Sequence, residues 1–132
     1  TNSSSVNDVE FIDFLIELIS DQYNINQDRV YATGMSNGGF FSYLLACQLS
    51  NKIAAVASVT GSMTNDTFNN CDPSKEVPVL QIHGTEDPIV TYEGNSAIGS
   101  IGIEQVLSYW KINNYCGDPT ISELSDPSCM PG

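Results

Sequence analysis

Apolar residues recur at helical spacing along the first part of the chain. Val9, Ile12, Ile16 and Ile19 follow this spacing, and neighbouring apolar side chains widen the stripe beyond one helix seam. A Ser-x-x-Asp pattern that begins at Ser5 is typical of a helix N-terminus. The pattern therefore predicts an amphipathic helix that is covered on more than one side.

Three short apolar segments alternate with helical or polar stretches in the rest of the chain. They cover residues 30–33, 53–59 and 77–82, and the second resembles strands that are buried on both faces. Helical patterns follow at residues 40–49 and 101–113. Strands separated by helices or long crossovers predict a parallel α/β sheet. We expect a three-layer α/β/α sandwich in which the strand at 30–33 lies between the other two.

The length of 132 residues corresponds to a single domain. The helix and strand patterns end near residue 116, and we assign residues 1–116 to this domain. From residue 117 to 132 the composition turns to Gly, Asp, Pro and Ser, which predicts a loop or linker tail.

Charge restricts the classes of partner. The chain has 16 Asp and Glu against 4 Lys and Arg, which gives a formal net charge of −12. Such acidity repels phosphate backbones and anionic membranes. No apolar run is long enough to span a bilayer, and the first residues lack the basic and apolar regions of a signal peptide. We expect a soluble chain that binds neither nucleic acid nor membrane.

Four cysteines, Cys47, Cys71, Cys116 and Cys129, occur without a CxxC pair and beside a single histidine. This pattern disfavours a zinc site and favours disulfides in an oxidising compartment. Cys47 ends a predicted helix that runs back toward the amino ends of the strands, and Cys71 precedes the third strand. We therefore expect these two to pair, and Cys116 to pair with Cys129 or with a cysteine beyond the chain.

The segment Gly34-Met35-Ser36-Asn37-Gly38 matches the G-x-S-x-G pattern at the point where a predicted strand meets a predicted helix. In such a nucleophile elbow the serine occupies a strained turn, and the residues two positions before and after it must be small. Ser36 is then the candidate nucleophile, and the backbone N–H of Asn37 the candidate oxyanion donor. The alternative is a Gly-rich turn with a helix-capping serine. Phosphate binding is disfavoured because no lysine follows the glycines.

Asp87 lies in the segment after the third predicted strand, at the same sheet edge as Ser36. Hydrolases of this architecture carry their triad in the order Ser, acid, His, and Asp87 fits the place of the acid. The alternatives are a turn-forming Asp before Pro88, and Glu86 as the acid. His83, the only histidine, precedes the acid, and we expect it to pack or to hydrogen-bond beneath the loop rather than to act as the base.

These segments resemble a known group of enzymes. The stretches DVEFIDFLIELI, NINQDRVYATGMSNGGFFSYLLACQLSNKIAAVASVTGSM, VPVLQIHGTEDPIVTYEG and YWKINNYC are similar to the secreted polyhydroxybutyrate depolymerase and feruloyl esterase group of α/β-hydrolases. GMSNGG and HGTEDPIV are far more specific than G-x-S-x-G alone. The resemblance implies the central part of an α/β-hydrolase fold and a secreted or periplasmic carboxylic ester hydrolase. It also implies Ser36 as nucleophile, Asp87 as triad acid, and no metal or organic cofactor.

The sequence also departs from that group. Its members carry strands and an oxyanion loop upstream of the position of Val6, and a triad histidine downstream of the region matched here. The sequence thus looks like the middle of a longer hydrolase whose histidine is not in this chain. The implied substrate is a polyester, an acyl-substituted polysaccharide or a small ester, and uncovered sheet edges favour self-association. The alternative is a non-catalytic remnant that serves as an interaction module.

Overall fold

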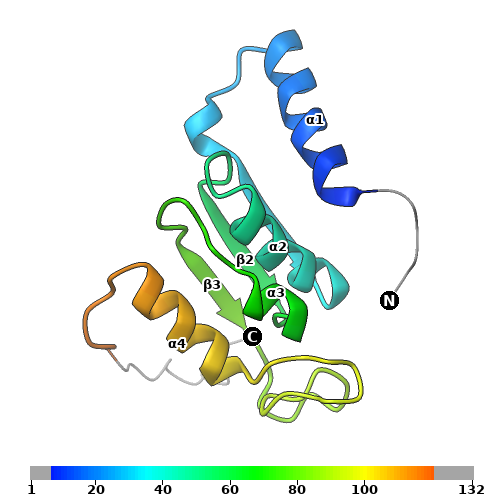
Figure 1. The fold of residues 1–132 in the computed structure, drawn as a ribbon, viewed down its shortest axis with the longest axis vertical. Helices are drawn as coiled ribbons and strands as arrows, with labels where there is room; N and C mark the ends of the chain where they lie inside the picture. Colours follow the sequence, from blue (N-terminus) through cyan, green and yellow to red (C-terminus); the bar gives the residue numbers. More distant parts are fainter. Residues whose placement is uncertain (1–6, 121–132) are drawn as a thin grey trace, which may run out of the picture.

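The computed structural model describes residues 7–120, in which three parallel strands lie against a layer of helices (Figure 1). The elements in chain order are α1 (Asp8–Gln22), the 3₁₀ turn η1 (Gln27–Arg29), β1 (Tyr31–Met35), α2 (Asn37–Gln48), β2 (Ala55–Val59), α3 (Asn65–Asn69), β3 (Val79–Ile82) and α4 (Ile103–Asn113). The predicted parallel α/β class is confirmed. Ser5 and Cys129 lie outside the described residues, and Asn7 caps α1 by accepting a hydrogen bond from the N–H of Glu10.

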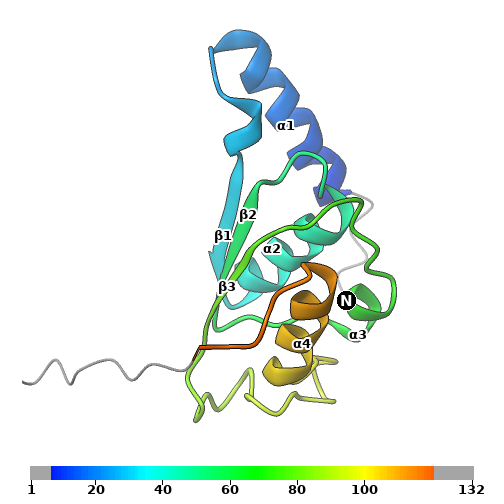
Figure 2. The ribbon, with the colours of Figure 1, turned by 90° about the vertical axis from the view of Figure 1, so that its left-hand side faces the viewer.

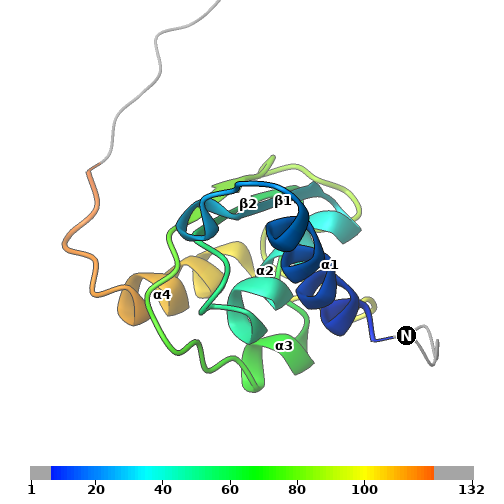
Figure 3. The ribbon, with the colours of Figure 1, turned by 90° about the horizontal axis from the view of Figure 1, so that it is seen from above.

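The sheet has the strand order β1-β2-β3, so β2 is the middle strand. Tyr31 pairs with Ala55, and Val56 pairs with Val79. The prediction that the strand near residues 30–33 lies between the other two is therefore wrong. The reason is that α2 and α3 lie on the same face of the sheet (Figures 2 and 3). Right-handed crossovers on one face advance the chain in one direction across the sheet.

Within residues 7–120, helices α1 to α4 lie on one side of the sheet, as Figure 3 shows from above. Since side chains alternate along a strand, the other side carries every second residue. There, Tyr31, Met35, Leu80 and Ile82 are 61%, 70%, 55% and 53% exposed. Residues 7–120 thus supply two of the three expected layers, the sheet and one layer of helices.

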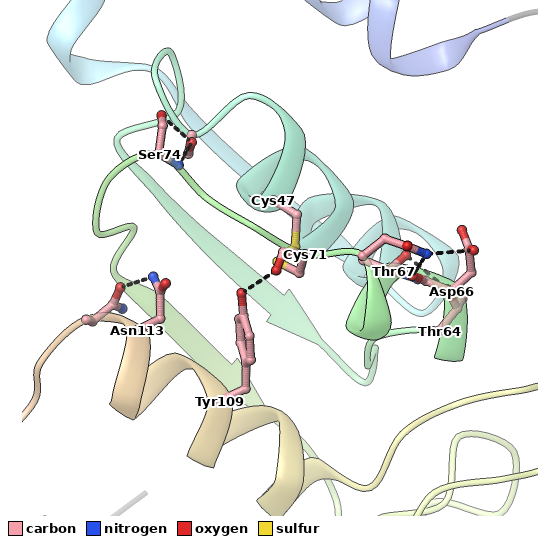
Figure 4. The surroundings of a disulfide bond; sticks show 11 residues. Cys47, Thr64, Asp66, Thr67, Cys71, Ser74, Tyr109 and Asn113 are labelled. Carbon is pink, nitrogen blue, oxygen red and sulfur yellow. Dashed lines mark hydrogen bonds between the residues drawn. A yellow bond between two sulfur atoms is a disulfide. The ribbon is translucent and has the colours of Figure 1, made fainter.

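The core lies between the sheet and α2 and α4. Tyr43 of α2 stacks on Trp110 of α4 with 6.1 Å between ring centroids, and both side chains are buried. The disulfide between Cys47 and Cys71 joins the end of α2 to the segment after α3, with 5.0 Å between the Cα atoms (Figure 4). The predicted pairing of these cysteines is confirmed, and Tyr109 donates a hydrogen bond to the carbonyl of Cys71.

Helix α1 is less covered than its wide apolar stripe predicts. Val9, Ile12 and Ile16 pack against the core, whereas Phe11 and Phe14 on the same helix are exposed. The expectation of cover on more than one side is not met by the residues that the structure describes. Within residues 7–120 no helix combines the length and the apolar character that a membrane crossing requires.

Candidate active site

Ser36 lies in a tight turn between β1 and α2. Its backbone has φ 53° and ψ −116°, a conformation that L residues rarely adopt, and its N–H donates to the carbonyl of Val59 at 2.8 Å. Ser36 holds the N-cap position of α2, yet its side chain makes no capping hydrogen bond. The exposed hydroxyl is therefore available for chemistry at the carboxyl edge of the sheet.

The glycines around Ser36 allow close approaches of the backbone. A Cβ at Gly34 would lie 2.5 Å from the carbonyl carbon of Gly38, which explains why this position must be small. A Cβ at Gly38 would meet nothing within 4 Å. The expected need for a small residue therefore has a steric cause two positions before Ser36 but not two positions after it. Sequence reasoning missed Gly39, where a Cβ would lie 2.6 Å from Ser58 Oγ and 2.9 Å from the Cα of Gly61. The pair of adjacent glycines was the available signal.

Asn37 is the first residue of α2, directly after Ser36. The first N–H groups of a helix have no intrahelical acceptor, and the helix dipole places partial positive charge there. Asn37 is exposed, so its N–H lies where a negatively charged oxygen beside Ser36 could accept a hydrogen bond. Its role as an oxyanion donor stays a prediction.

Asp87 lies on the loop that follows β3, where two backbone N–H groups point at one of its oxygens. Its Oδ1 accepts from the N–H of Ile89 and from that of Val90, each at 2.9 Å. These two hydrogen bonds, that from Ile89 first, hold the pKa of Asp87 below its usual value. Asp87 thus stabilises a turn, and both of these hydrogen bonds are to Oδ1. Glu86 is exposed, and no hydrogen bond within residues 7–120 fixes its carboxylate.

His83 packs beneath the Asp87 loop, as expected. Its side chain is 1% exposed, and Nε2 lies 2.7 Å from the carbonyl oxygen of Val90. Nδ1 lies 3.0 Å from Nε2 of Gln81. Both ring nitrogens of His83 therefore have partners within the fold.

The parallel strands bring Ser36 and Asp87 to one edge of the sheet without joining them. Ser36 follows β1, Asp87 follows β3, and β2 lies between these two strands. Two strand spacings amount to about 10 Å, which leaves room for an imidazole ring. The loops after β2 and β3 are tied together by Ser62, whose Oγ donates to the carbonyl of Ile101 at 2.5 Å. Within residues 7–120, no cluster of three or more His, Cys, Asp or Glu could hold a metal ion.

Residues 4–111 match the model of the phospholipase/carboxylesterase family. The chain is 34% identical over 109 residues to feruloyl esterase D of Neurospora crassa, which covers 83% of this chain and 34% of the relative. It is 29% identical over 126 residues to feruloyl esterase B of Piromyces equi, covering 88% and 24%. Over 86 residues it is 35% identical to a bifunctional acetylxylan esterase/xylanase of Neocallimastix patriciarum, covering 65% and 12%.

The fold is also similar to the crystal structure of a thermostable esterase. The TM-score is 0.59 at 21% sequence identity, and the match covers 78% of this chain and 26% of the other. The chain thus spans 12% to 34% of the length of the three curated relatives above. The family match extends over most of the sequence and includes β1, the Ser36 turn and the Asp87 loop. The chain therefore belongs to the phospholipase/carboxylesterase family of α/β-hydrolases.

Proposed function

We propose that the protein is a carboxylic ester hydrolase with Ser36 as nucleophile. The observation that carries this proposal is the geometry of Ser36. This residue lies in a strained turn at the end of a parallel strand, and its hydroxyl makes no capping hydrogen bond to the following helix. Asp87 is the triad acid, at the same sheet edge. The triad histidine comes from outside this 132-residue sequence.

In this mechanism the histidine takes the proton of Ser36 while Oγ attacks the ester carbonyl carbon. The carbonyl oxygen becomes negative and accepts a hydrogen bond from the N–H of Asn37. The histidine then protonates the leaving alcohol as its bond to the acyl carbon breaks. Water next attacks the acyl group while the histidine takes its proton, and the histidine returns this proton to Ser36 as the acid leaves. Oδ2 of Asp87 accepts from the other ring nitrogen and holds the histidine in the required orientation.

The histidine must come from elsewhere because His83, the single histidine of the sequence, is engaged on both nitrogens. Loss of a triad member removes about four orders of magnitude of rate or more. The 132-residue polypeptide by itself is therefore expected to hydrolyse esters poorly or not at all.

We infer that the substrate is a feruloyl or acetyl ester of a polysaccharide. The support is the names of the relatives, which are feruloyl esterases and an acetylxylan esterase. A polyester substrate has no counterpart among these relatives. The disulfide between Cys47 and Cys71 supports a secreted or periplasmic location, because such bonds persist in oxidising compartments.

The test is labelling by a fluorophosphonate and turnover of methyl ferulate and acetylated xylan by the full-length protein. We expect Ser36→Ala to abolish labelling and to lower kcat/KM at least about 10⁴-fold. The matched control is Ser108→Ala, which removes an exposed serine from α4 and should change neither readout. Wild-type protein that neither reacts with the probe nor turns over either ester would instead favour the non-catalytic interaction module.

The identity of the acid has its own test. Asp87→Asn is expected to lower kcat about 10⁴-fold, because the histidine loses its orienting carboxylate. Glu86→Gln should leave kcat close to the wild-type value, since Glu86 is exposed. The reverse pattern would assign the acid to Glu86.

A further inference from the structure

A chain of hydrogen bonds runs from the core to the Asp87 loop. The hydroxyl of Tyr43 donates to Oε1 of Gln81 at 2.7 Å. Nε2 of Gln81 donates to the carbonyl of Gly61 at 2.8 Å and contacts Nδ1 of His83 at 3.0 Å. Burial raises the pKa of Tyr43, so its hydroxyl stays protonated and can act as the hydrogen-bond donor. The amide of Gln81 is thus held on both its oxygen and its nitrogen.

These contacts determine which nitrogen of His83 carries the proton. The carbonyl oxygen of Val90 can only accept, so Nε2 of His83 bears the hydrogen and donates at 2.7 Å. Nδ1 then accepts from Gln81, which is oriented by Tyr43 and Gly61. The ring also lies edge-on to Tyr92, with 6.0 Å between centroids. His83 is therefore an oriented link between β3 and the loop.

Val90 is held from both sides of its backbone. Its carbonyl accepts from His83, and its N–H donates to Oδ1 of Asp87 at 2.9 Å. The position of Oδ1 therefore depends on the position of Val90. The other oxygen of Asp87, Oδ2, lies 4.0 Å from Nε2 of His83, beyond hydrogen-bond distance. This arrangement fixes one oxygen and leaves the other available.

We propose that His83 is a positioning residue that acts through Val90 and fixes the direction in which Asp87 presents Oδ2 to the triad histidine. This proposal rests on the proposed function of Asp87. In this proposal His83 positions Asp87 and does not act as the general base. The link requires a side chain that accepts from Gln81 on one side and reaches Val90 as a donor on the other.

A matched pair of variants isolates the contact with Val90. In His83→Gln the amide nitrogen can reach the carbonyl of Val90, whereas in His83→Asn the side chain is one methylene shorter and cannot. The control is Tyr109→Phe, which removes a hydrogen bond to the carbonyl of Cys71, away from this loop. All three are compared in the full-length protein.

The first readout is amide hydrogen exchange of residues 84–91. His83→Asn should accelerate this exchange about tenfold or more, because the amides of Ile89 and Val90 lose their ordered acceptor. His83→Gln and Tyr109→Phe should leave it within about threefold of the wild type. Equal exchange in the Asn and Gln variants would overturn the proposal.

The second readout is steady-state turnover of a nitrophenyl ester. His83→Asn should lower kcat about 10- to 100-fold with KM unchanged, since misplacing a supporting group costs orientation rather than binding. His83→Gln should restore kcat to within about threefold. A His83→Gln enzyme as inactive as Ser36→Ala would overturn the proposal and make His83 the base. If the wild type lacks esterase activity, the proposed function fails, and hydrogen exchange still decides whether His83 holds the loop.

Discussion

Two residues at the carboxyl edge of the sheet, Ser36 and Thr60, have backbone angles that favour glycine. Their φ values are 53° and 49°, and each N–H is held by the neighbouring strand, Ser36 by Val59 and Thr60 by Ile82. A β-branched residue at positive φ is unusual, and such conformations cost about 1 to 3 kcal/mol each. The surrounding hydrogen bonds maintain this strain where the candidate site lies.

Gly34 supports a sharp prediction because its contacts are with backbone atoms. Gly34→Ala places a Cβ 2.5 Å from the carbonyl carbon of Gly38, and the helix must shift to accept it. We expect the free energy of unfolding to fall by about 1 to 3 kcal/mol, measured by chemical denaturation. The control Gly38→Ala meets nothing within 4 Å and should be neutral or stabilising. Equal effects of the two substitutions would contradict this explanation of the turn.

Asp87 gives a prediction for the pH dependence of stability. Its folded pKa lies below the usual value of 3.8 because the N–H groups of Ile89 and Val90 favour the carboxylate. The stabilisation is therefore complete above pH 3.8, and it is lost as the pH falls through the lower, folded pKa.

Comparison of wild type with Asp87→Asn tests this direction, since charge-assisted hydrogen bonds are the stronger ones. The wild type should be the more stable of the two at neutral pH, and the difference should vanish in strong acid. Denaturation curves across the acid range measure it. A difference that grows on acidification would show that the pKa is raised instead.

At the scale of elements, the disulfide fastens the end of α2 to the segment before β3. Cys47 and Cys71 are 24 positions apart, and closing a loop of this size stabilises a protein by about 3 kcal/mol. We expect the double variant Cys47→Ser/Cys71→Ser to unfold at a correspondingly lower denaturant concentration. The control Ser108→Ala changes an exposed residue of α4 away from the disulfide and should leave the midpoint unchanged. A double variant with the wild-type midpoint would show that the bond adds nothing to stability.

Hydrophobic pattern predicted the long elements well because their periodicity is local. The three strands and the helices around residues 8–22, 37–48 and 103–113 lie close to where the pattern placed them. The short helix α3 was missed because its sequence, NDTFN, is polar and typical of a loop, and Thr64 starts it by capping the N–H of Thr67. The strand order was missed because no local pattern records which face a crossover helix covers.

Some features of the candidate site could likewise be predicted from local sequence, and others could not. Ser36 and Asp87 were proposed from the sequence because motif spacing and strand ends are visible in it. The approach of Gly39 to Gly61 and the link from Tyr43 through Gln81 to His83 were not. These contacts join segments that are far apart along the chain, and single-sequence patterns carry no information about such pairs.

At the scale of the whole molecule, the sheet face that residues 7–120 leave uncovered predicts self-association of the 132-residue polypeptide. This face carries four large exposed apolar side chains on its two outer strands, Tyr31 and Met35 on β1 and Leu80 and Ile82 on β3. Sedimentation velocity should show species larger than the monomer that become more abundant with concentration.

Two variants test whether this face is responsible. Leu80→Lys should reduce association strongly, because it places a charge on this apolar face. Ile112→Lys alters an apolar and more exposed position on α4, in the helical layer, and should have little effect. A monomer at every concentration, or equal effects of the two variants, would be evidence against an association through the sheet.

The strand order β1-β2-β3 is also the order in which a ribosome makes these strands. Tyr31 pairs with Ala55 and Val56 with Val79, so each pairing joins residues made only a short time apart. Neither pairing needs a residue from beyond the next strand, so each can form once that strand is free of the ribosome. The Ser36 turn needs only Val59 to hold its N–H and Gly61 to receive Gly39. The strained elbow needs no residue beyond Gly61 for these contacts, so it can form while the Asp87 loop is still inside the ribosome.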